Sequence, residues 1–192
     1  MPKAKAFIGL QHAVATCKRC DLWKTRTNPV LGEGSLDAKI LFVGEAPGFN
    51  EDRQGKPFVG KAGAIFDQLL TSVDLKRQDI YITNVLKCRP PKNRNPFPGE
   101  VKACSLYLNS QIEIIKPEKI CCLGNFATSF IMKKFGLQDR LAGISKIHGK
   151  TFTVSTLAGP IKIIPLYHPA VATYDAEMLE PLKKDFSVLM EA

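Results

Sequence analysis

The sequence predicts an α/β fold, in which a mainly parallel sheet lies between two layers of helices. Two observations predict it: four short runs are almost entirely apolar, and the segments between them have helical spacing. The runs cover residues 39–45, 79–86, 119–124 and 161–168. Their apolar residues are near-continuous rather than alternating, which is typical of strands covered on both faces. We therefore expect a three-layer α/β/α sandwich around a central four-stranded sheet.

Segments with helical spacing occupy the intervals between the predicted strands. They cover residues 60–73, 99–115 and 125–136, and further helices are expected near residues 4–16 and 180–190. The alternation of strands and helices predicts parallel pairing, with helices on both faces of the sheet. In such sheets ligands bind beyond the carboxyl ends of the strands, so polar residues at those ends are the first candidates for a site.

Length, composition and charge narrow the class of protein. The 192 residues are 45% hydrophobic and contain no visible repeat, so we expect one domain spanning residues 1–192. No run reaches the roughly 18 apolar residues needed to cross a bilayer, and the first segment is too amphipathic for a signal sequence. We therefore expect a cytoplasmic protein without a membrane partner. The net charge of +9 favours a polyanion such as nucleic acid.

Polar residues stand at the ends of three predicted strands. The first strand ends in GEAPGFNED, where Gly44 begins a tight turn and Glu45 and Glu51 supply carboxylates. Asn84 lies inside the second apolar run, and His168 ends the fourth. Each residue also has an ordinary structural explanation: a capping acid, an amide that ties down a loop, or a histidine with its hydrogen bonds satisfied. Convergence at one sheet edge favours a functional site.

Four of the six cysteines have spacing that suggests a metal site. They are Cys17 and Cys20, which form C-x2-C, and Cys88 and Cys104, which bracket a basic, proline-rich loop. The wide spacing matches neither a zinc finger nor a compact ferredoxin, and four thiolates suit zinc or an iron–sulfur cluster equally well by number. The other two, Cys121 and Cys122, lie in an apolar run and are expected to be buried as small hydrophobic residues.

Several motifs together resemble family 4 uracil-DNA glycosylases, the iron–sulfur members of the uracil-DNA glycosylase superfamily. The segments are GEAPGFNEDRQGKPFVGKAG, TNVLKCRPPKNRNP and YHPA, together with the four spaced cysteines. They occur in the family's order between about Cys17 and Pro169, and each falls at a predicted strand end. The resemblance implies an enzyme that flips uracil out of DNA and hydrolyses its N-glycosidic bond, which leaves an abasic site.

The resemblance also implies roles for three side chains in the pocket. His168 resembles the residue that donates a hydrogen bond to O2 of uracil while charge develops on the leaving base. Asn84 resembles the residue whose amide pairs with O4 and N3–H, a polarity that cytosine reverses at both atoms. Phe58 resembles the aromatic residue that stacks on the flipped base, whereas its structural alternative is core packing.

The first motif carries the remaining uracil contacts that the resemblance implies. Gly44, Glu45 and Ala46 correspond to the segment that contacts the base, and Glu45 is expected to orient the attacking water. Family 1 enzymes have an aspartate where Ala46 lies, so this chain departs from them at the expected water-activating position. Glu51 corresponds to a position near the C5 edge, where a bulky group excludes the methyl group of thymine.

By the same resemblance, the cysteines hold a 4Fe–4S cluster and the loop between them contacts DNA. The cluster ligands are Cys17, Cys20, Cys88 and Cys104. The expected phosphate contacts are Lys87, Arg89, Lys92 and Arg94. Candidates for the residue that wedges into the duplex are Val171, Ala172 and Tyr174. We expect a monomer that acts on uracil-containing DNA, single- or double-stranded.

Two other classes of protein fit parts of the same pattern. One is a basic zinc module that binds nucleic acid without catalysis, in which His168 is structural. The other is an electron-transfer protein that uses the same cluster. Electron transfer explains neither Asn84 nor the turns of the first motif, so catalysis on DNA accounts for more of the sequence.

Overall fold

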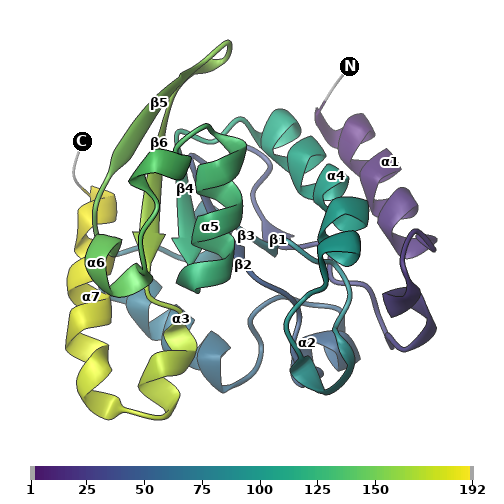
Figure 1. The fold of residues 1–192 in the computed structure, drawn as a ribbon, viewed down its shortest axis with the longest axis horizontal. Helices are drawn as coiled ribbons and strands as arrows, with labels where there is room; N and C mark the ends of the chain where they lie inside the picture. The colour runs from purple at the N-terminus through teal and green to yellow at the C-terminus, as the bar shows by residue number, and fades with distance from the viewer. Residues whose placement is uncertain (1–2, 191–192) are drawn as a thin grey trace.

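A six-stranded sheet forms the centre of the computed structural model, which describes residues 3–190 (Figure 1). The strand order is β1-β3-β2-β4-β6-β5. The four central strands run parallel: β3 (Tyr81–Asn84), β2 (Ile40–Gly44), β4 (Lys119–Leu123) and β6 (Gly159–Leu166). They coincide with the four apolar runs, so the prediction of a mainly parallel central sheet is confirmed.

The sheet also has two antiparallel edge strands, which the sequence does not predict. β1 (Glu33–Gly34) pairs with β3, and β5 (Phe152–Thr156) pairs with β6. β1 contains two residues, and β5 alternates between half-buried and exposed positions, so neither forms an apolar run. The β5–β6 hairpin projects beyond the rest of the sheet (Figure 1). The sheet therefore has six strands rather than the predicted four, and the two additional strands are the edge strands β1 and β5.

Helices cover both faces of the sheet. They are α1 (Lys3–Ala15), α2 (Phe49–Gln54), α3 (Lys61–Thr71), α4 (Pro98–Ile115), α5 (Gly124–Lys134), α6 (Ile144–Ile147) and α7 (Leu179–Ser187). The five longer helices match the predicted ones, whereas α2 and α6 have only 6 and 4 residues and are too short to show a helical period. Among the described residues, no helix combines the length and apolar character needed to span a membrane.

The two faces of the sheet support separate cores, because successive side chains of a strand point in opposite directions. In β4, Ile120 and Cys122 join the core that includes α4 and α5. Cys121 and Leu123 join the opposite core, which includes α3 and α7. Cys121 and Cys122 are fully buried, as the sequence predicts. The three-layer α/β/α sandwich is confirmed.

Parallel pairing brings the carboxyl ends of β2, β3 and β6 to the same edge of the sheet. Gly44 at the end of β2 pairs with Asn84 at the end of β3. Two further backbone hydrogen bonds tie the segments beyond the strands: Val85 N–H donates to the Gly44 carbonyl at 2.9 Å, and Leu86 N–H to the Glu45 carbonyl at 3.0 Å. These backbone bonds hold the first and second motifs side by side.

The aromatic cluster under the α3 and α7 face provides a test of this packing. The Phe42 ring lies 5.0 Å from Phe66 and 5.6 Å from Phe186, measured between centroids, and all three are fully buried. We expect Phe42→Ala to lower the free energy of unfolding by about 3–5 kcal/mol, because it leaves a cavity. Leu157→Ala, at a fully exposed hairpin position, should change it by less than about 0.5 kcal/mol. Equal effects in urea denaturation would contradict the packing.

Candidate active site

A pocket at the carboxyl ends of the central strands gathers residues from three separate motifs. Its volume is about 470 Å³, within the range of small-molecule sites. The predicted uracil contacts that line it are Glu45, Ala46, Glu51, Phe58, Asn84 and His168. Gly44 lies behind them, next to the Asn84 and Phe58 side chains. The structure therefore brings the whole predicted set together, while the role of each residue stays a prediction.

Gly44 allows the Asn84 and Phe58 side chains to meet. A Cβ atom at position 44 would lie 2.3 Å from Asn84 Oδ1 and 3.0 Å from the Phe58 ring. Asn84 is 3% exposed, and within residues 3–190 its carboxamide forms no hydrogen bond, although it lines the pocket. A buried amide ordinarily has partners. Its donor and acceptor are therefore available to a ligand with the complementary pair.

Phe58 is held in an unusual backbone conformation at the base of the pocket. Its φ of 51° lies in the left-handed region, which is costly for an aromatic residue. Arg77 donates to the carbonyls of Pro57 and Phe58, and Gly63 leaves room for the Phe58 carbonyl. The Phe58 ring also packs on Phe66 in the core. Phe58 is thus a core side chain that also lines the pocket, and its stacking on a base stays a prediction.

His168 presents one ring nitrogen to the backbone and leaves the other free. Its Nδ1 accepts a hydrogen bond from Ala170 N–H at 3.1 Å, so the neutral ring carries its proton on Nε2. The ring lies 5.7 Å from the Phe58 ring at an interplanar angle of 28°. Burial lowers the pKa of His168 to about 4, against the opposing influence of the Glu51 carboxylate. The imidazole is therefore a neutral donor at physiological pH.

The two carboxylates of the first motif have different environments. Glu51 accepts hydrogen bonds from three backbone N–H groups, those of Gly48 at 3.1 Å, Val59 at 2.9 Å and Gly60 at 3.0 Å. It links the α2 turn to the segment that carries Phe58. The half-buried Glu45 forms no such bonds with residues 3–190, and burial raises its pKa above the usual value of 4.5. Glu45 is thus the carboxylate that remains available for chemistry.

Lys87 does not contact phosphate, contrary to the prediction. Its side chain is 1% exposed. The ammonium donates inside the protein to Thr83 Oγ1 at 2.7 Å, Asn84 O at 2.6 Å and Gln111 Oε1 at 2.7 Å. Desolvation lowers its pKa to about 7. Lys87 instead supports the strand end that carries Asn84, which the basic composition of the loop could not reveal.

The other three basic residues of the loop differ in what holds them. Arg94 lines the pocket, and its guanidinium forms a bidentate ion pair with Glu100, which raises the Arg94 pKa. Arg89 Nε donates to Asn93 Oδ1 at 2.7 Å. Lys92 is exposed and has a φ of 54°. Arg89 and Lys92 are therefore better placed for phosphates than Arg94, whose charge is largely balanced.

Asn93 lines the pocket and is missing from the predicted set. Its φ of 55° is in the left-handed region, which asparagine tolerates better than most residues. The only sequence signal was an asparagine within a proline-rich loop, which is also the ordinary composition of a turn. Asn93 therefore could not be separated from a turn residue before the loop was placed.

The four predicted ligand cysteines line one small cavity. Cys17 and Cys20 follow α1, Cys88 follows β3, and Cys104 lies in α4. All are free thiols, and burial raises the pKa of Cys20, of Cys88 and, to about 11, of Cys104. Arg26 Nη1 donates to Cys88 Sγ at 3.1 Å, and Lys87 N–H donates to Cys104 Sγ at 3.2 Å.

The chemistry of the donor set, four thiols around one cavity, fits either zinc or an iron–sulfur cluster. Within residues 3–190, no three His, Cys, Asp or Glu side chains are close enough together to hold one metal ion. The neighbouring Arg26 and Lys87 suit the negative charge of thiolate ligands.

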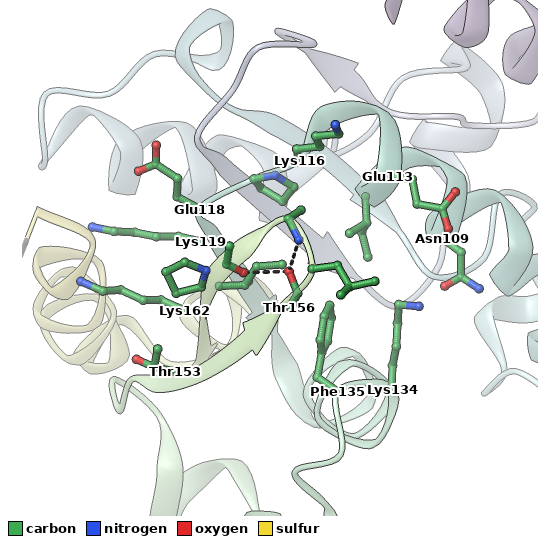
Figure 2. A pocket seen from close by; sticks show the side chains of 17 residues that line it. Asn109, Glu113, Lys116, Glu118, Lys119, Lys134, Phe135, Thr153, Thr156 and Lys162 are labelled. Atoms are coloured by element: carbon green, nitrogen blue, oxygen red, sulfur yellow. Dashed lines mark hydrogen bonds between the residues drawn. The ribbon is translucent and has the colours of Figure 1, made fainter. Parts of the chain in front are cut away.

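A larger cavity than the strand-end pocket lies at the other end of the sheet. It is a groove of about 1080 Å³ between the end of α4 and the β5–β6 hairpin, and Lys116, Lys134 and Lys162 stand around it (Figure 2). It lies at the amino ends of β4 and β6, and none of the predicted site residues lines it. Size alone therefore does not locate the site, whereas the strand ends do.

Comparison with known proteins agrees with the geometry of the pocket. Residues 31–189 match the model of the uracil DNA glycosylase superfamily. The chain belongs to this superfamily. A type-4 uracil-DNA glycosylase of Archaeoglobus fulgidus is 47% identical over 178 residues, which cover 93% of this chain and 88% of that protein. The type-4 enzyme of Sulfurisphaera tokodaii is 44% identical over 95% of this chain and 82% of its own length.

Similarity to other branches of the uracil DNA glycosylase superfamily is weaker. A type-5 uracil-DNA glycosylase of Pyrobaculum aerophilum is 29% identical over 85% of this chain. The type-4 enzyme of Thermotoga maritima, by contrast, is 46% identical over 84% of this chain. The type-4 relatives therefore share more of the sequence, in agreement with the family 4 resemblance of the motifs.

The charge state of His168 can be measured directly. We expect NMR titration of its imidazole to give a pKa of about 4 and a proton on Nε2. Because the unfolded chain binds this proton near pH 6.5 and the folded one does not, His168 should make folding less favourable as the pH falls from 6.5 to about 4. His168→Asn, which assigns the signals, should flatten that part of the stability profile. A pKa at or above 6.5 would contradict the desolvated ring.

Proposed function

We propose that this protein excises uracil from DNA in DNA repair by the pocket at the ends of β2, β3 and β6. Family membership supports the activity, and the convergence of Asn84, Phe58 and His168 in one pocket supports the site. The enzyme is a uracil-DNA glycosylase, a hydrolase of N-glycosidic bonds. The flipped uracil occupies the pocket, where its polar edges replace water as partners of the protein.

Asn84 selects uracil by its unpaired carboxamide. Uracil offers an acceptor at O4 and a donor at N3–H, and an amide complements this pair with one donor and one acceptor. Cytosine reverses both atoms, so it would leave the buried amide without partners. Buried polar groups without partners give strong discrimination. The bond from Lys87 Nζ to the Asn84 carbonyl helps to hold the strand end in place.

His168 stabilises the leaving base as a neutral hydrogen-bond donor. Ala170 N–H occupies Nδ1, which directs the Nε2 proton into the pocket towards O2 of uracil. Negative charge builds on O2 as the N-glycosidic bond breaks, so this bond is stronger in the transition state than in the ground state. A neutral ring also avoids the cost of burying an imidazolium ion beside apolar Phe58.

The carboxylates of the first motif orient water and shape the pocket. Glu45 is proposed to align the water that attacks the anomeric carbon, since its oxygens accept no backbone hydrogen bond from the part of the chain that the structure describes. Because burial raises the pKa of Glu45, its carboxylate ionises at a higher pH than that of an ordinary glutamate, and this role requires the ionised form. Glu51 is proposed to bound the pocket at the C5 edge, where thymine carries a methyl group. Three backbone N–H bonds hold it still, as steric exclusion requires.

We propose that the cysteine cavity holds a 4Fe–4S cluster. The donor set of Cys17, Cys20, Cys88 and Cys104 supports it. When bound, the cluster supplies a cross-link between α1, the loop after β3, and α4. This chain's Arg26 side chain donates to Cys88 Sγ, and the backbone N–H of Lys87 donates to Cys104 Sγ, so both stabilise thiolate ligands.

The surface around the pocket is proposed to bind the DNA strand. Arg89 and Lys92 contact phosphates, and Tyr174, which is 92% exposed in the loop after His168, supplies the wedge. Val171 and Ala172 pack against the core, which makes them weaker candidates. We propose one domain, because the segment after α1 brings two of the ligand cysteines to the sheet. We also propose that the protein is a monomer. The free thiols suit a reducing cytoplasm.

Removing the two polar groups of the pocket should abolish most uracil release. We expect His168→Ala to slow single-turnover release from a uracil-containing oligonucleotide by about 10²- to 10³-fold, as for the loss of one oxyanion donor. Asn84→Ala should lose activity to a similar degree. His12→Ala and Asn109→Ala, which remove the same groups outside the pocket, serve as controls. Wild-type rates in both pocket variants, with the fold intact by circular dichroism, would refute this site.

The metal content separates the cluster from zinc. Anaerobically purified protein should be brown, absorb near about 400 nm and contain iron and sulfide, whereas zinc bound by four thiolates is colourless. Cys88→Ser should lose iron, because it removes one ligand. Cys122→Ala, which removes a buried thiol far from the cavity, should keep it. Stoichiometric zinc without iron in elemental analysis would exclude the cluster.

A further inference from the structure

We propose that two exposed phenylalanines, Phe49 and Phe97, form a stacking track for unpaired bases beside the pocket, so that the enzyme prefers single-stranded DNA. The inference rests on the proposed function and adds the form of the DNA substrate. The track consists of the two rings and three arginines that contact them: Arg53, Arg89 and Arg94.

The exposure of these two rings is unusual in this chain. Phe49 is 51% exposed and Phe97 is 57% exposed. Every other phenylalanine among the described residues is buried or half-buried. An aromatic ring in water forgoes a large apolar burial that its fold could otherwise use. Both rings belong to segments that flank the pocket, where a bound strand would cover them.

Both rings stand next to residues that line the pocket. Phe49 begins α2 directly after Gly48, and Phe97 precedes α4 three residues after Arg94. Arg89 connects the first ring to the pocket, because it lies over Phe49 and donates to Asn93, which lines the pocket. A strand whose uracil occupies the pocket would therefore pass these rings with its neighbouring nucleotides.

The arginines give the track its charge. The guanidinium carbons of Arg89 and Arg53 lie 5.1 and 5.6 Å from the Phe49 centroid. Neither forms an ion pair with a residue in the range 3–190, so both charges are available to phosphates. Aromatic rings alternating with free arginines are typical of surfaces that bind single strands.

The Phe97 end of the track is rigid. Arg94 lies 3.6 Å from the Phe97 centroid, and Glu100 fixes it with a bidentate ion pair. Glu100 also accepts a hydrogen bond from Phe97 N–H at 2.8 Å. Arg94 covers one side of the ring, and the rest stays exposed. Little side-chain entropy remains to be lost when a base stacks there.

Unpaired bases fit this surface better than paired ones. Bases in a duplex are stacked on each other and present only their edges, whereas every base of a single strand has a free face. Stacking on a phenylalanine is tolerant of sequence, which suits an enzyme that must find uracil beside any neighbour. A duplex would gain from the arginines but not from the rings.

Binding to DNA without uracil tests the track separately from catalysis. We expect Phe49→Ala and Phe97→Ala each to raise the Kd for a labelled single-stranded oligonucleotide by about fivefold or more. The Kd for the same strand in a duplex should change by less than about twofold. Phe49→Tyr and Phe97→Tyr should restore single-strand affinity, because the ring is kept. Leu157→Ala, which removes an exposed apolar side chain from the distant hairpin, is the matched control.

The outcomes distinguish the track from the proposed function. If the wild-type protein releases uracil but the alanine variants bind single strands normally, the track is wrong and the glycosylase assignment stands. Equal losses on single strands and duplexes, or no recovery with tyrosine, would also overturn the track. If single-strand binding depends on the rings but no uracil is released by the wild-type enzyme, the proposed function fails instead.

Discussion

The close approach of Gly44, Asn84 and Phe58 is the constraint on which the site depends. The parallel register of β2 and β3 sets Gly44 beside Asn84, and the missing side chain at position 44 is the space that the carboxamide and the ring share. A pocket for a flat base requires such a narrow gap between an aromatic face and a polar edge. The sheet register therefore sets Gly44 against Asn84, while the loop that carries Phe58 and the Arg77 hydrogen bond to its carbonyl place the ring.

Desolvation determines the charge of the groups around this gap. It keeps His168 neutral, raises the pKa of Glu45, and lowers that of Lys87 to about 7. A low-dielectric pocket favours neutral donors and acceptors, and these are the groups that a neutral base presents. The positive charge of the protein is placed instead on the exposed rim, at residues such as Arg89 and Lys92. In the proposed function, the exposed charges bind the DNA strand and the neutral polar groups recognise the base.

The same loop connects three parts of the molecule. Residues 85–97 leave β3 beside Asn84, pass Cys88 at the cysteine cavity, and reach the rim at Phe97. Lys87 is the internal link, since its ammonium bonds the Asn84 carbonyl while its N–H bonds Cys104 Sγ. Under the proposed function, anchoring of this loop at the cavity would therefore affect both base recognition and strand binding. This accounts for a proline-rich basic loop that is bracketed by cysteines and packed against a core.

The sequence by itself determined the parallel core and the five longer helices, because apolar runs and helical spacing are local patterns. Strand ends and cysteine spacing also singled out Asn84, His168 and the four cysteines, whereas Phe58 was expected only from the family resemblance. Only the tertiary structure decided the direction of each side chain. It turned Lys87 inward although composition placed it on the surface, added β5, whose alternating FTVST has no apolar run, and left Phe49 and Phe97 exposed. The physical reason is that burial depends on what packs opposite a residue, and the opposing residues are distant in the chain.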